Sequence, residues 1–229
     1  MYVTSPNHYV DSDISRVSRD FLASEVFERA AIRSLPEESL LFCEGDEAVQ
    51  VYEILEGVVR TSKVLCDGRR QIISFGYPGD LVGISHDCRY HYDCETVSEV
   101  KLRAHRKNAC SANSQTEPEF CKLLLKHTAF EMNSMQEHFL MLGRKSALEK
   151  ICSFLVVLLD KVAVEENGLM RFQVPMYRSD IADFLGLTIE TVSRTITKLR
   201  KDGVIDLPKP NEIIVCQPAK LRALAERSE

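Results

Sequence analysis

Two short helical patterns, joined at a glycine, constrain this chain more than any other feature of its sequence. In the first pattern, which begins near Tyr177, the residues Ile181, Ala182 and Leu185 recur at the spacing of one helix face. Gly186 follows, and glycine tolerates the positive φ that a tight turn requires. The stretch therefore predicts a short amphipathic helix that stops abruptly and is followed at once by a second one.

The second pattern predicts a helix over residues 189–201, with Thr188 as the residue whose hydroxyl caps its N-terminus. Val192, Ile196 and Leu199 fall at i, i+4 and i+7, so one face is apolar and would face the first helix. The opposite face is polar and mostly basic. This arrangement is typical of a helix-turn-helix, whose second helix enters the major groove of double-stranded DNA.

Glu190 and Arg194 lie one turn apart on the polar face. Arg194 can donate two parallel hydrogen bonds to guanine O6 and N7, and Glu190 can accept one from cytosine N4, so together they suit a C·G pair. An ordinary helical hairpin with solvated charges would explain the periodicity. It would not explain a single Glu beside Ser and Arg on an otherwise cationic face, and the DNA-binding interpretation is therefore preferred.

The polar residues of this region divide into two predicted groups. Side chains near the start of the second helix are expected to read base edges, and these are Ile189, Glu190, Ser193 and Arg194. Hydroxyl and basic side chains around them are expected to contact phosphates, and these are Arg178, Thr188, Thr191, Lys198, Arg200 and Lys201.

Charge is distributed unevenly along the chain, whose formal net charge is −5. Residues 1–120 contain 13 Lys and Arg against 20 Asp and Glu, whereas residues 121–229 contain 16 against 14. Within residues 188–201 there are four basic side chains and one acidic one. Binding to DNA would depend on this local basic stripe. The acidic N-terminal half would repel DNA and so reduce non-specific binding.

With 229 residues, of which 45% are hydrophobic, the chain can bury a substantial core in one large domain or two smaller ones. No apolar run approaches the roughly 20 residues that a membrane span needs. The polar start, Met1-Tyr-Val-Thr-Ser-Pro, is unlike a signal peptide. We therefore expect a cytoplasmic protein with no membrane partner.

Upstream of the helical region the pattern is that of short strands. From about residue 40 to 104, apolar-rich segments alternate with turn signals such as Asp67-Gly68, and this spacing predicts a small antiparallel barrel or roll. The segments 49–59 and 70–75 are expected to be its core strands. Before the roll, residues 13–33 show a modest amphipathic helical pattern that Pro36 would end.

A long helix is predicted from beyond Pro118 to about Arg144, and Gly143 would end or bend it and serve as a hinge. Its apolar positions alternate spacings of four and three for about three heptads, as in a coiled coil. This seam consists of Cys121, Leu125, Thr128, Met132, Met135, Phe139 and Leu142. The stripe can pack on the chain's own barrel. A helix-turn-helix protein that binds a two-fold symmetric DNA site must be a dimer, however, so we expect a homodimer.

The remaining pattern predicts a helix over residues 146–162, a small β-wing with Lys209 near its tip, and a short helix around 219–225. The fold class is α+β. The predicted divisions are an N-terminal arm and helix over 1–35, a β-roll over 36–116, a dimerisation helix over 117–145 and a winged helix-turn-helix over 146–229.

This order of elements resembles that of the CRP/FNR superfamily of bacterial transcription regulators over nearly the full length, and the closest branch looks like FNR and FixK. Gly186-Leu-Thr-Ile-Glu-Thr-Val-Ser-Arg is similar to the family's recognition helix, and Tyr77-Pro-Gly-Asp-Leu-Val-Gly to a motif of its cyclic-nucleotide-binding-type β-roll. The resemblance implies a homodimer that reads a TTGAT…ATCAA palindrome through Glu190, Ser193 and Arg194. It also implies recruitment of RNA polymerase at genes for low-oxygen respiration, denitrification or nitrogen fixation.

The sensors of the best-known branches are missing from the sequence. The cyclic-AMP branch holds its ligand with Gly-Glu-Leu and Arg-Ser signatures, neither of which occurs over residues 82–95. The acidic residues Asp87, Asp93 and Glu95 would instead repel a phosphate. The iron–sulfur branch uses an N-terminal cysteine cluster, whereas the first cysteine here is Cys43. We therefore expect no cofactor and no cyclic nucleotide.

One loop holds four residues of metal-ligand type within nine positions, and these are His86, Cys88, His91 and Cys94. Their spacing fits no established metal or haem motif, so an unliganded loop is favoured over a metal site. Cys88 and Cys94 are also candidates for a transient disulfide. The eight cysteines of the chain are dispersed, as is typical of buried thiols that serve packing.

The sequence thus predicts a DNA-binding transcription regulator of FixK type, and an activator. The alternative is a regulator of the same superfamily whose roll is gated by haem, a metal or thiol chemistry. An enzyme is disfavoured, because the sequence offers no nucleophile–base pair, no phosphate-cradling glycine loop and no established metal signature.

Overall fold

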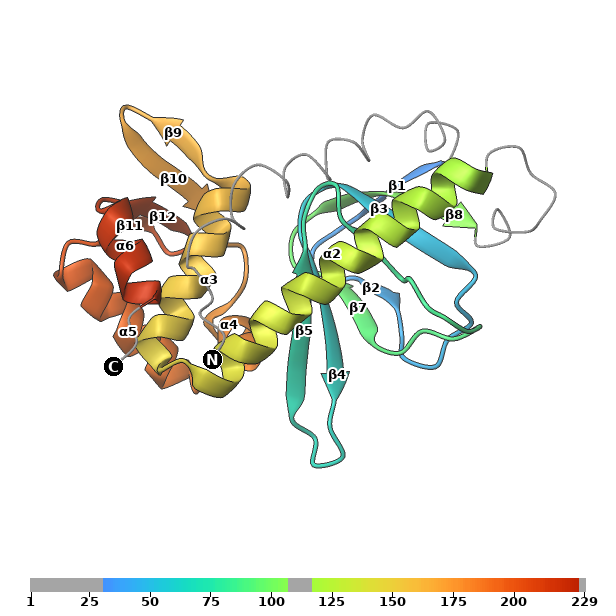
Figure 1. Ribbon diagram of the computed structural model, residues 1–229, viewed down its shortest axis with the longest axis horizontal. Coiled ribbons are helices and arrows are strands. Elements are labelled where there is room, and N and C mark those ends of the chain that lie inside the picture. The colour runs from blue at the N-terminus through green and yellow to red at the C-terminus, as the bar shows by residue number, and fades with distance from the viewer. Residues whose placement is uncertain (1–30, 107–116, 227–229) are drawn as a thin grey trace, which may run out of the picture.

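The structure is a computed structural model that describes residues 31–106 and 117–226. Figure 1 shows two lobes, a β-roll and a lobe built from the C-terminal helices and one sheet. The long helix α2 (Glu117–Arg144) runs diagonally across the roll and ends beside the second lobe. Within the described ranges, no helix is long and apolar enough to cross a membrane.

The roll consists of two four-stranded antiparallel sheets. One sheet has the strand order β1-β8-β3-β6, and the other has the order β2-β7-β4-β5. The strands are β1 (Ile32–Leu35), β2 (Leu40–Phe42), β3 (Gln50–Glu56), β4 (Val59–Val64), β5 (Arg70–Gly76), β6 (Leu81–Val82), β7 (Asp93–Thr96) and β8 (Val100–Arg106). Inward-facing apolar side chains of both sheets form one core, as the period of two along a strand requires.

Glycines set the two turns on either side of β4. Gly57 lies between β3 and β4 with φ +84°, and a Cβ at this position would approach the carbonyl oxygen of Glu99 to 2.1 Å. Asp67-Gly68 closes the β4–β5 hairpin, as predicted. Gly57 turns the chain and divides the segment expected over residues 49–59 into β3 and β4.

Aromatic rings occupy the interior of the roll. Phe42 stacks on Tyr90 with ring centroids 3.8 Å apart, and the ring of Tyr52 lies 6.0 Å from that of Phe42. The Tyr90 hydroxyl donates a hydrogen bond of 2.8 Å to the carbonyl of Gln50, so this buried phenol is satisfied. These contacts hold the loop that carries Tyr90 firmly against the strands beneath it.

The helix predicted over residues 13–33 lies mostly outside the described residues, but its end is wrong. Ile32–Leu35 forms strand β1, which pairs antiparallel with β8 from Ile32↔Arg103 to Leu35↔Val100. The edge of β8 offers a row of backbone donors and acceptors, and these stabilise an extended segment rather than a helix. The roll therefore begins at Ile32 and not at residue 36.

A short linker separates α2 from the next helix, α3 (Ala147–Val162). The helix α2 continues through Gly143 and ends one residue later, at the predicted Arg144, so this glycine does not itself end the helix. A capping box sets the break instead: the Ser146 hydroxyl accepts from the Glu149 N–H, and the Glu149 carboxylate accepts from the Ser146 N–H at 2.6 Å.

The C-terminal lobe is a winged helix-turn-helix. After α3 it contains β9 (Val164–Glu166), β10 (Leu169–Gln173), α4 (Arg178–Leu185), α5 (Ile189–Lys201), β11 (Ile205–Lys209), β12 (Glu212–Val215) and α6 (Pro218–Ala225). The strands β11 and β12 form the expected wing, and Lys209 lies beside its turn. The β9–β10 hairpin was not predicted, although Asn167-Gly168, both at positive φ, is a strong hairpin signal.

The two lobes share an aromatic cluster. Phe75 of β5, Phe154 of α3 and Phe184 of α4 have ring centroids 5.2 to 6.3 Å apart. The imidazole of His138 on α2 stacks on Phe184 at 4.1 Å. The C-terminal lobe is therefore packed against the roll and is not merely tethered to it.

Candidate DNA interface

The turn between α4 and α5 has the geometry that its sequence predicts. Gly186 forms the C-cap of α4 in the left-handed region, with φ +60° and ψ +45°. The Thr188 hydroxyl accepts a hydrogen bond of 3.2 Å from the Thr191 N–H and caps α5. The three predicted apolar residues of α5 are buried, and these are Val192, Ile196 and Leu199. The predicted second helix is confirmed in both extent and orientation.

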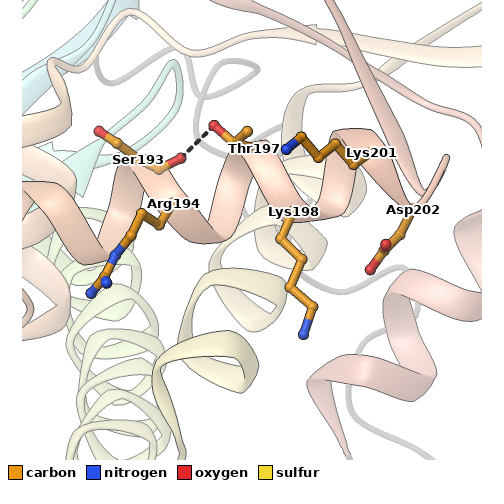
Figure 2. Close-up of a pocket in the computed structure, with 6 residues that line it drawn as sticks. All are labelled: Ser193, Arg194, Thr197, Lys198, Lys201 and Asp202. Carbon is orange, nitrogen blue, oxygen red and sulfur yellow. Dashed lines mark hydrogen bonds between the residues drawn. The ribbon is translucent and has the colours of Figure 1, made fainter.

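The outer face of α5 carries a shallow hollow, shown in Figure 2. It is lined by Ser193, Arg194, Thr197, Lys198, Lys201 and Asp202. Figure 2 shows Arg194 and Lys198 extending to the same side of the helix, while the Thr197 hydroxyl donates to the Ser193 carbonyl at 2.8 Å. The structure thus brings four predicted site residues together and adds Thr197 and Asp202, which were not predicted.

Ile189 and Glu190 occupy exposed positions in the first turn of α5. The pKa of Glu190 is lowered, first by a hydrogen bond from its own backbone N–H, then by the Thr188 hydroxyl and by the positive charge of Arg194. An ionised carboxylate only accepts hydrogen bonds. This end of the helix therefore presents a fixed acceptor one turn before the donor Arg194.

The other predicted phosphate contacts do not line the hollow. Arg178 is the first residue of α4 and is half-buried, and burial lowers its pKa. The hydroxyls of Thr188 and Thr191 bond to each other at 3.0 Å. Arg200 lies 3.6 Å from the carboxylate of Asp206. These four residues surround the face rather than form it.

The predicted seam of α2 is exposed along most of its length. The exposed fractions are 72% for Leu125, 55% for Met132, 60% for Met135 and 76% for Phe139. Leu142 is half-buried near the α4–α5 turn, and the Cys121 side chain lies outside the described residues. The alternative in which this stripe packs on the chain's own roll is therefore wrong for the four exposed residues.

The opposite side of α2 is the one that contacts the roll. The buried His127 accepts a hydrogen bond of 3.0 Å at Nε2 from the Leu81 N–H, so its proton lies on Nδ1. Burial lowers the pKa of this imidazole and favours the neutral form. Nearby, Lys161 of α3 forms an ion pair of 2.6 Å with Asp80. Both contacts fasten the segment around residues 77–83 to the helices.

A buried ionic cluster joins α4 to the roll. Arg60 on β4, whose side chain is 6% exposed, lies 3.2 Å from Asp180 in the first turn of α4. Its other guanidinium nitrogens lie 3.0 Å from Glu38 and 3.0 Å from Glu95. Burial lowers the pKa of Arg60, but hydrogen bonds to the two glutamates and the negative charges of Asp180 and Glu95 together raise it by more. The group therefore stays charged.

Arg70 on β5 extends this cluster. It lies 2.5 Å from Asp180, which is 1% exposed, and 2.9 Å from Asp183. Gln71 adds a hydrogen bond of 2.6 Å to the Asp183 carbonyl. Sequence reasoning missed these residues, because Asp180 also fits an ordinary capping position three residues after Tyr177 and nothing local indicates its distant partners.

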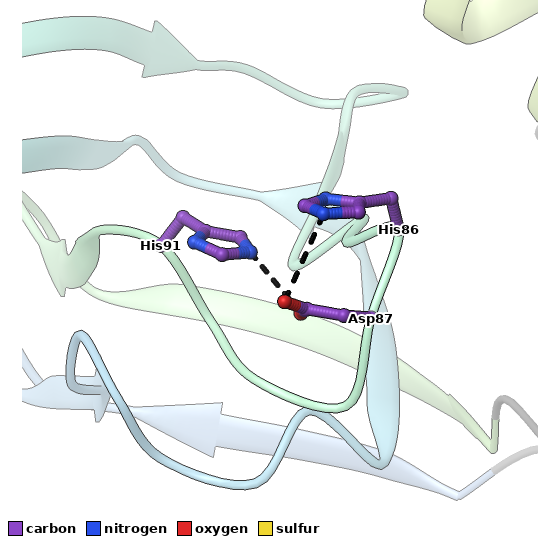
Figure 3. A group of neighbouring side chains, drawn as sticks. All are labelled: His86, Asp87 and His91. Atoms are coloured by element: carbon purple, nitrogen blue, oxygen red, sulfur yellow. Dashed lines mark hydrogen bonds and ion pairs between the residues drawn. The ribbon is translucent and has the colours of Figure 1, made fainter.

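The four ligand candidates, three in the β6–β7 loop and Cys94 in β7, are not brought together. Cys94 is fully buried in the roll core, where burial raises the pKa of its thiol, whereas Cys88 is exposed, and both are free thiols. The four candidates therefore do not form one ligand set, and no disulfide joins Cys88 to Cys94 in this structure. His86 and His91 instead face the carboxylate of Asp87, as Figure 3 shows.

A β-roll, a long helix with an exposed apolar seam and a winged helix-turn-helix with a mixed-charge outer face together define a DNA-binding transcription regulator. Residues 149–224 match the Crp-like helix-turn-helix domain, and residues 32–112 match the cyclic nucleotide-binding domain. With the similarities that follow, these matches show that the chain belongs to the CRP/FNR family of transcription regulators.

Two curated relatives and one solved structure illustrate the similarity. The transcriptional activatory protein AadR of Rhodopseudomonas palustris is 39% identical over 203 residues, which are 88% of this chain and 84% of the relative. The nitrogen fixation regulation protein FixK of Azorhizobium caulinodans is 40% identical over 187 residues, 81% of this chain and 75% of the relative. FixK2 from Bradyrhizobium japonicum matches with a TM-score of 0.79 and 31% identity, covering 87% of this chain and 99% of that one.

These relatives confirm the predicted fold and class. The chain is a CRP/FNR-type transcriptional activator that binds DNA, and its relatives are regulators rather than enzymes.

Proposed function

We propose that the chain acts as a homodimer on a TTGAT…ATCAA-like palindrome, with α5 of each protomer reading one half-site. The exposed pair of Glu190 and Arg194 supports this proposal. The ionised carboxylate of Glu190 can accept a hydrogen bond from cytosine, and the guanidinium of Arg194, one turn later, can donate two to guanine, which suits the C·G pair within TTGA. Ile189 and the methyl group of Thr191 suit the neighbouring thymines, and Ser193 suits either kind of base.

The surrounding polar side chains are proposed to position α5 on the phosphate backbone. Lys198 and Lys201 extend the hollow beyond Arg194 and are the principal cations for this role. Arg178, Thr188, Thr191 and Arg200 surround the face and would reach phosphates at the rim of the groove. The protein partner is RNA polymerase. The proposed target genes are those of low-oxygen respiration, denitrification or nitrogen fixation, and the similarity to a nitrogen fixation regulation protein supports the last of these.

Dimerisation is proposed to occur through the exposed seam of α2. Phe139→Glu is expected to convert the dimer into a monomer and to abolish tight binding to the palindrome, because a charge would be buried within an apolar interface. Sedimentation analysis and a DNA titration at the same protomer concentration measure both effects.

The matched control is Asn133→Glu, which adds the same charge at an exposed position of α2 outside the seam. This variant should remain a dimer. A Phe139→Glu protein that sediments like the parent would place the dimer contact elsewhere.

We further propose that DNA binding needs no small-molecule effector. The rings of Phe42, Tyr52 and Tyr90 occupy the roll interior, and the pKa of Asp87 on the β6–β7 loop is lowered to about 2 by hydrogen bonds from the Arg89 N–H and the Ser85 hydroxyl. A fixed negative charge on this loop disfavours a phosphate ligand.

The corresponding test is an equilibrium titration of a TTGAT…ATCAA duplex with the purified chain alone at low salt. We expect tight binding that weakens steeply as salt is raised. Failure of the purified chain, with recovery on adding a small-molecule cell extract, would favour the gated regulator instead. Addition of cyclic AMP should leave the titration unchanged.

A further inference from the structure

We propose that the loop between β6 and β7 binds one divalent transition-metal ion through His86, Asp87 and His91. One ligand atom from each of these residues lies within 4.8 Å of the other two. Figure 3 shows the two imidazoles on the same side of the loop, both directed toward the carboxylate between them. The donor set is therefore two imidazole nitrogens and one carboxylate oxygen.

The measured distances suit a site that closes by small side-chain movements. The His91 Nε2 lies 3.1 Å from Asp87 Oδ1, and the His86 Nε2 lies 3.8 Å from Asp87 Oδ2. The two rings are nearly parallel, with centroids 5.0 Å apart. Ligands about 2.0–2.2 Å from an ion lie roughly 3.0–3.5 Å from one another. His86 is 82% exposed and has room to move that far.

The carboxylate is held in place before any ion arrives. Asp87 Oδ1 accepts hydrogen bonds of 2.9 Å from the Ser85 hydroxyl and 2.9 Å from the Arg89 N–H. These bonds keep its pKa at about 2, so the ligand is deprotonated at neutral pH. Each imidazole would bind the ion through an unprotonated ring nitrogen.

The backbone of the loop is also fixed. The Tyr90 N–H donates to the Asp46 carbonyl at 3.0 Å, and the Ala48 N–H donates to the Cys88 carbonyl at 2.8 Å. The Arg89 guanidinium donates to the Gly45 carbonyl at 2.6 Å. Together with the stacked ring of Tyr90, these bonds hold the backbone in place around the ligand residues. An ion would therefore not have to order a flexible segment.

The chemistry of the donors selects the metal. Imidazole nitrogen suits Zn²⁺, Ni²⁺, Cu²⁺ and Fe²⁺, whereas Mg²⁺ and Ca²⁺ prefer sites made of oxygen atoms. The ligands lie at the surface, which leaves the remaining coordination positions to water. Neither Cys88 nor Cys94 belongs to the set, which separates this site from the cysteine-based cluster of the iron–sulfur branch.

The test is calorimetric titration of the full-length protein with Zn²⁺ and, separately, with Mg²⁺, after removal of any purification tag and treatment with a chelator. We expect one Zn²⁺ per chain and no binding of Mg²⁺ at the same concentrations. His86→Gln should weaken Zn²⁺ binding by more than the about 10–100-fold that loss of an outer-shell partner produces. Zn²⁺ should also raise the melting temperature of the parent but not of this variant.

Two controls distinguish loss of the metal site from a general change in the protein. His86 is so exposed that His86→Gln should melt like the parent in the absence of metal. Cys88→Ser removes the nearest exposed thiol and should bind Zn²⁺ like the parent. The proposal fails if the His86→Gln and His91→Gln double variant keeps the parent affinity, if Cys88→Ser loses it, or if the parent binds no Zn²⁺ at micromolar concentrations.

Discussion

Replacing Arg194 by Ala is expected to weaken binding to the palindrome by about 1–3 kcal/mol at each half-site, and therefore by about 2–6 kcal/mol for a dimer. The guanidinium is exposed on α5, and its two parallel hydrogen bonds to guanine have no substitute among the neighbouring side chains. Because Arg194 is not part of the buried face of α5, the variant should fold normally. Titration of a palindromic and a scrambled duplex at one fixed salt concentration measures the effect.

The comparison with Lys201→Ala separates base reading from phosphate contact. Lys201 lines the same hollow but lies nearly two turns further along α5, beyond the part of the helix that reaches base edges. Its loss should weaken binding to both duplexes alike and should reduce the salt dependence. If Arg194→Ala also weakened binding to both duplexes equally, the assigned contact to guanine would be wrong.

Glu190 provides a second test of base reading at the C·G pair assigned to Arg194. Its carboxylate is held ionised at the helix N-terminus, and we assign it to cytosine N4 on the opposite strand of the same base pair. A duplex in which this C·G pair is replaced by T·A should therefore lose most of its advantage over scrambled DNA with the parent protein. With Arg194→Ala the same replacement should matter much less.

The parts of the fold that could be predicted from sequence are those fixed by neighbours in the chain. The limits of α5 follow from a capping hydroxyl at Thr188 and from the apolar spacing that starts at Val192, and both act within one helical turn. The β4–β5 hairpin follows from Asp67-Gly68 in the same way. These signals need no information from distant residues.

The features that were missed depend on contacts between residues far apart in the chain. The segment at Ile32 has weak helical spacing of its own, and only the edge of β8 makes it a strand. In the same way, the approach of His86 and His91 to Asp87 depends on how Tyr90 anchors the loop in the roll. A spacing rule cannot reveal either arrangement, because β8 and the ring of Phe42, on which Tyr90 stacks, lie far away in the chain.

The ionic cluster between the lobes is the clearest case, since Arg60 and Asp180 are 120 residues apart. Asp180 alone looks like a helix cap, and Arg60 alone looks like a polar residue on a strand. Only after the roll and the helix-turn-helix are packed together do the two charges become buried beside each other. The same packing makes the cluster sensitive to the loss of one member, because a buried charge without its partner is strongly destabilising.

Arg60→Met should therefore lower the free energy of unfolding by about 3–5 kcal/mol, the range typical of breaking a buried ion pair. The variant leaves three carboxylates, those of Glu38, Glu95 and Asp180, without the guanidinium that joins them. Urea denaturation at one fixed protomer concentration is the measurement, since the stability of a dimer depends on concentration.

The control on the same strand is Lys63→Met, whose exposed pair with Glu44 at 2.7 Å should contribute only about 0–1 kcal/mol. Asp180→Asn should cost less stability in the Arg60→Met variant than in the parent, because the Arg60–Asp180 interaction is already lost there and only the contact of Asp180 with Arg70 remains to be broken. Equal stability of Arg60→Met and Lys63→Met would mean that the ion pairs of Arg60 contribute no more than an exposed pair and that the other contacts hold the lobes together. A large difference, together with a smaller effect of Asp180→Asn in the Arg60→Met variant, would show that the roll fixes α4, and through it the recognition helix, by charge.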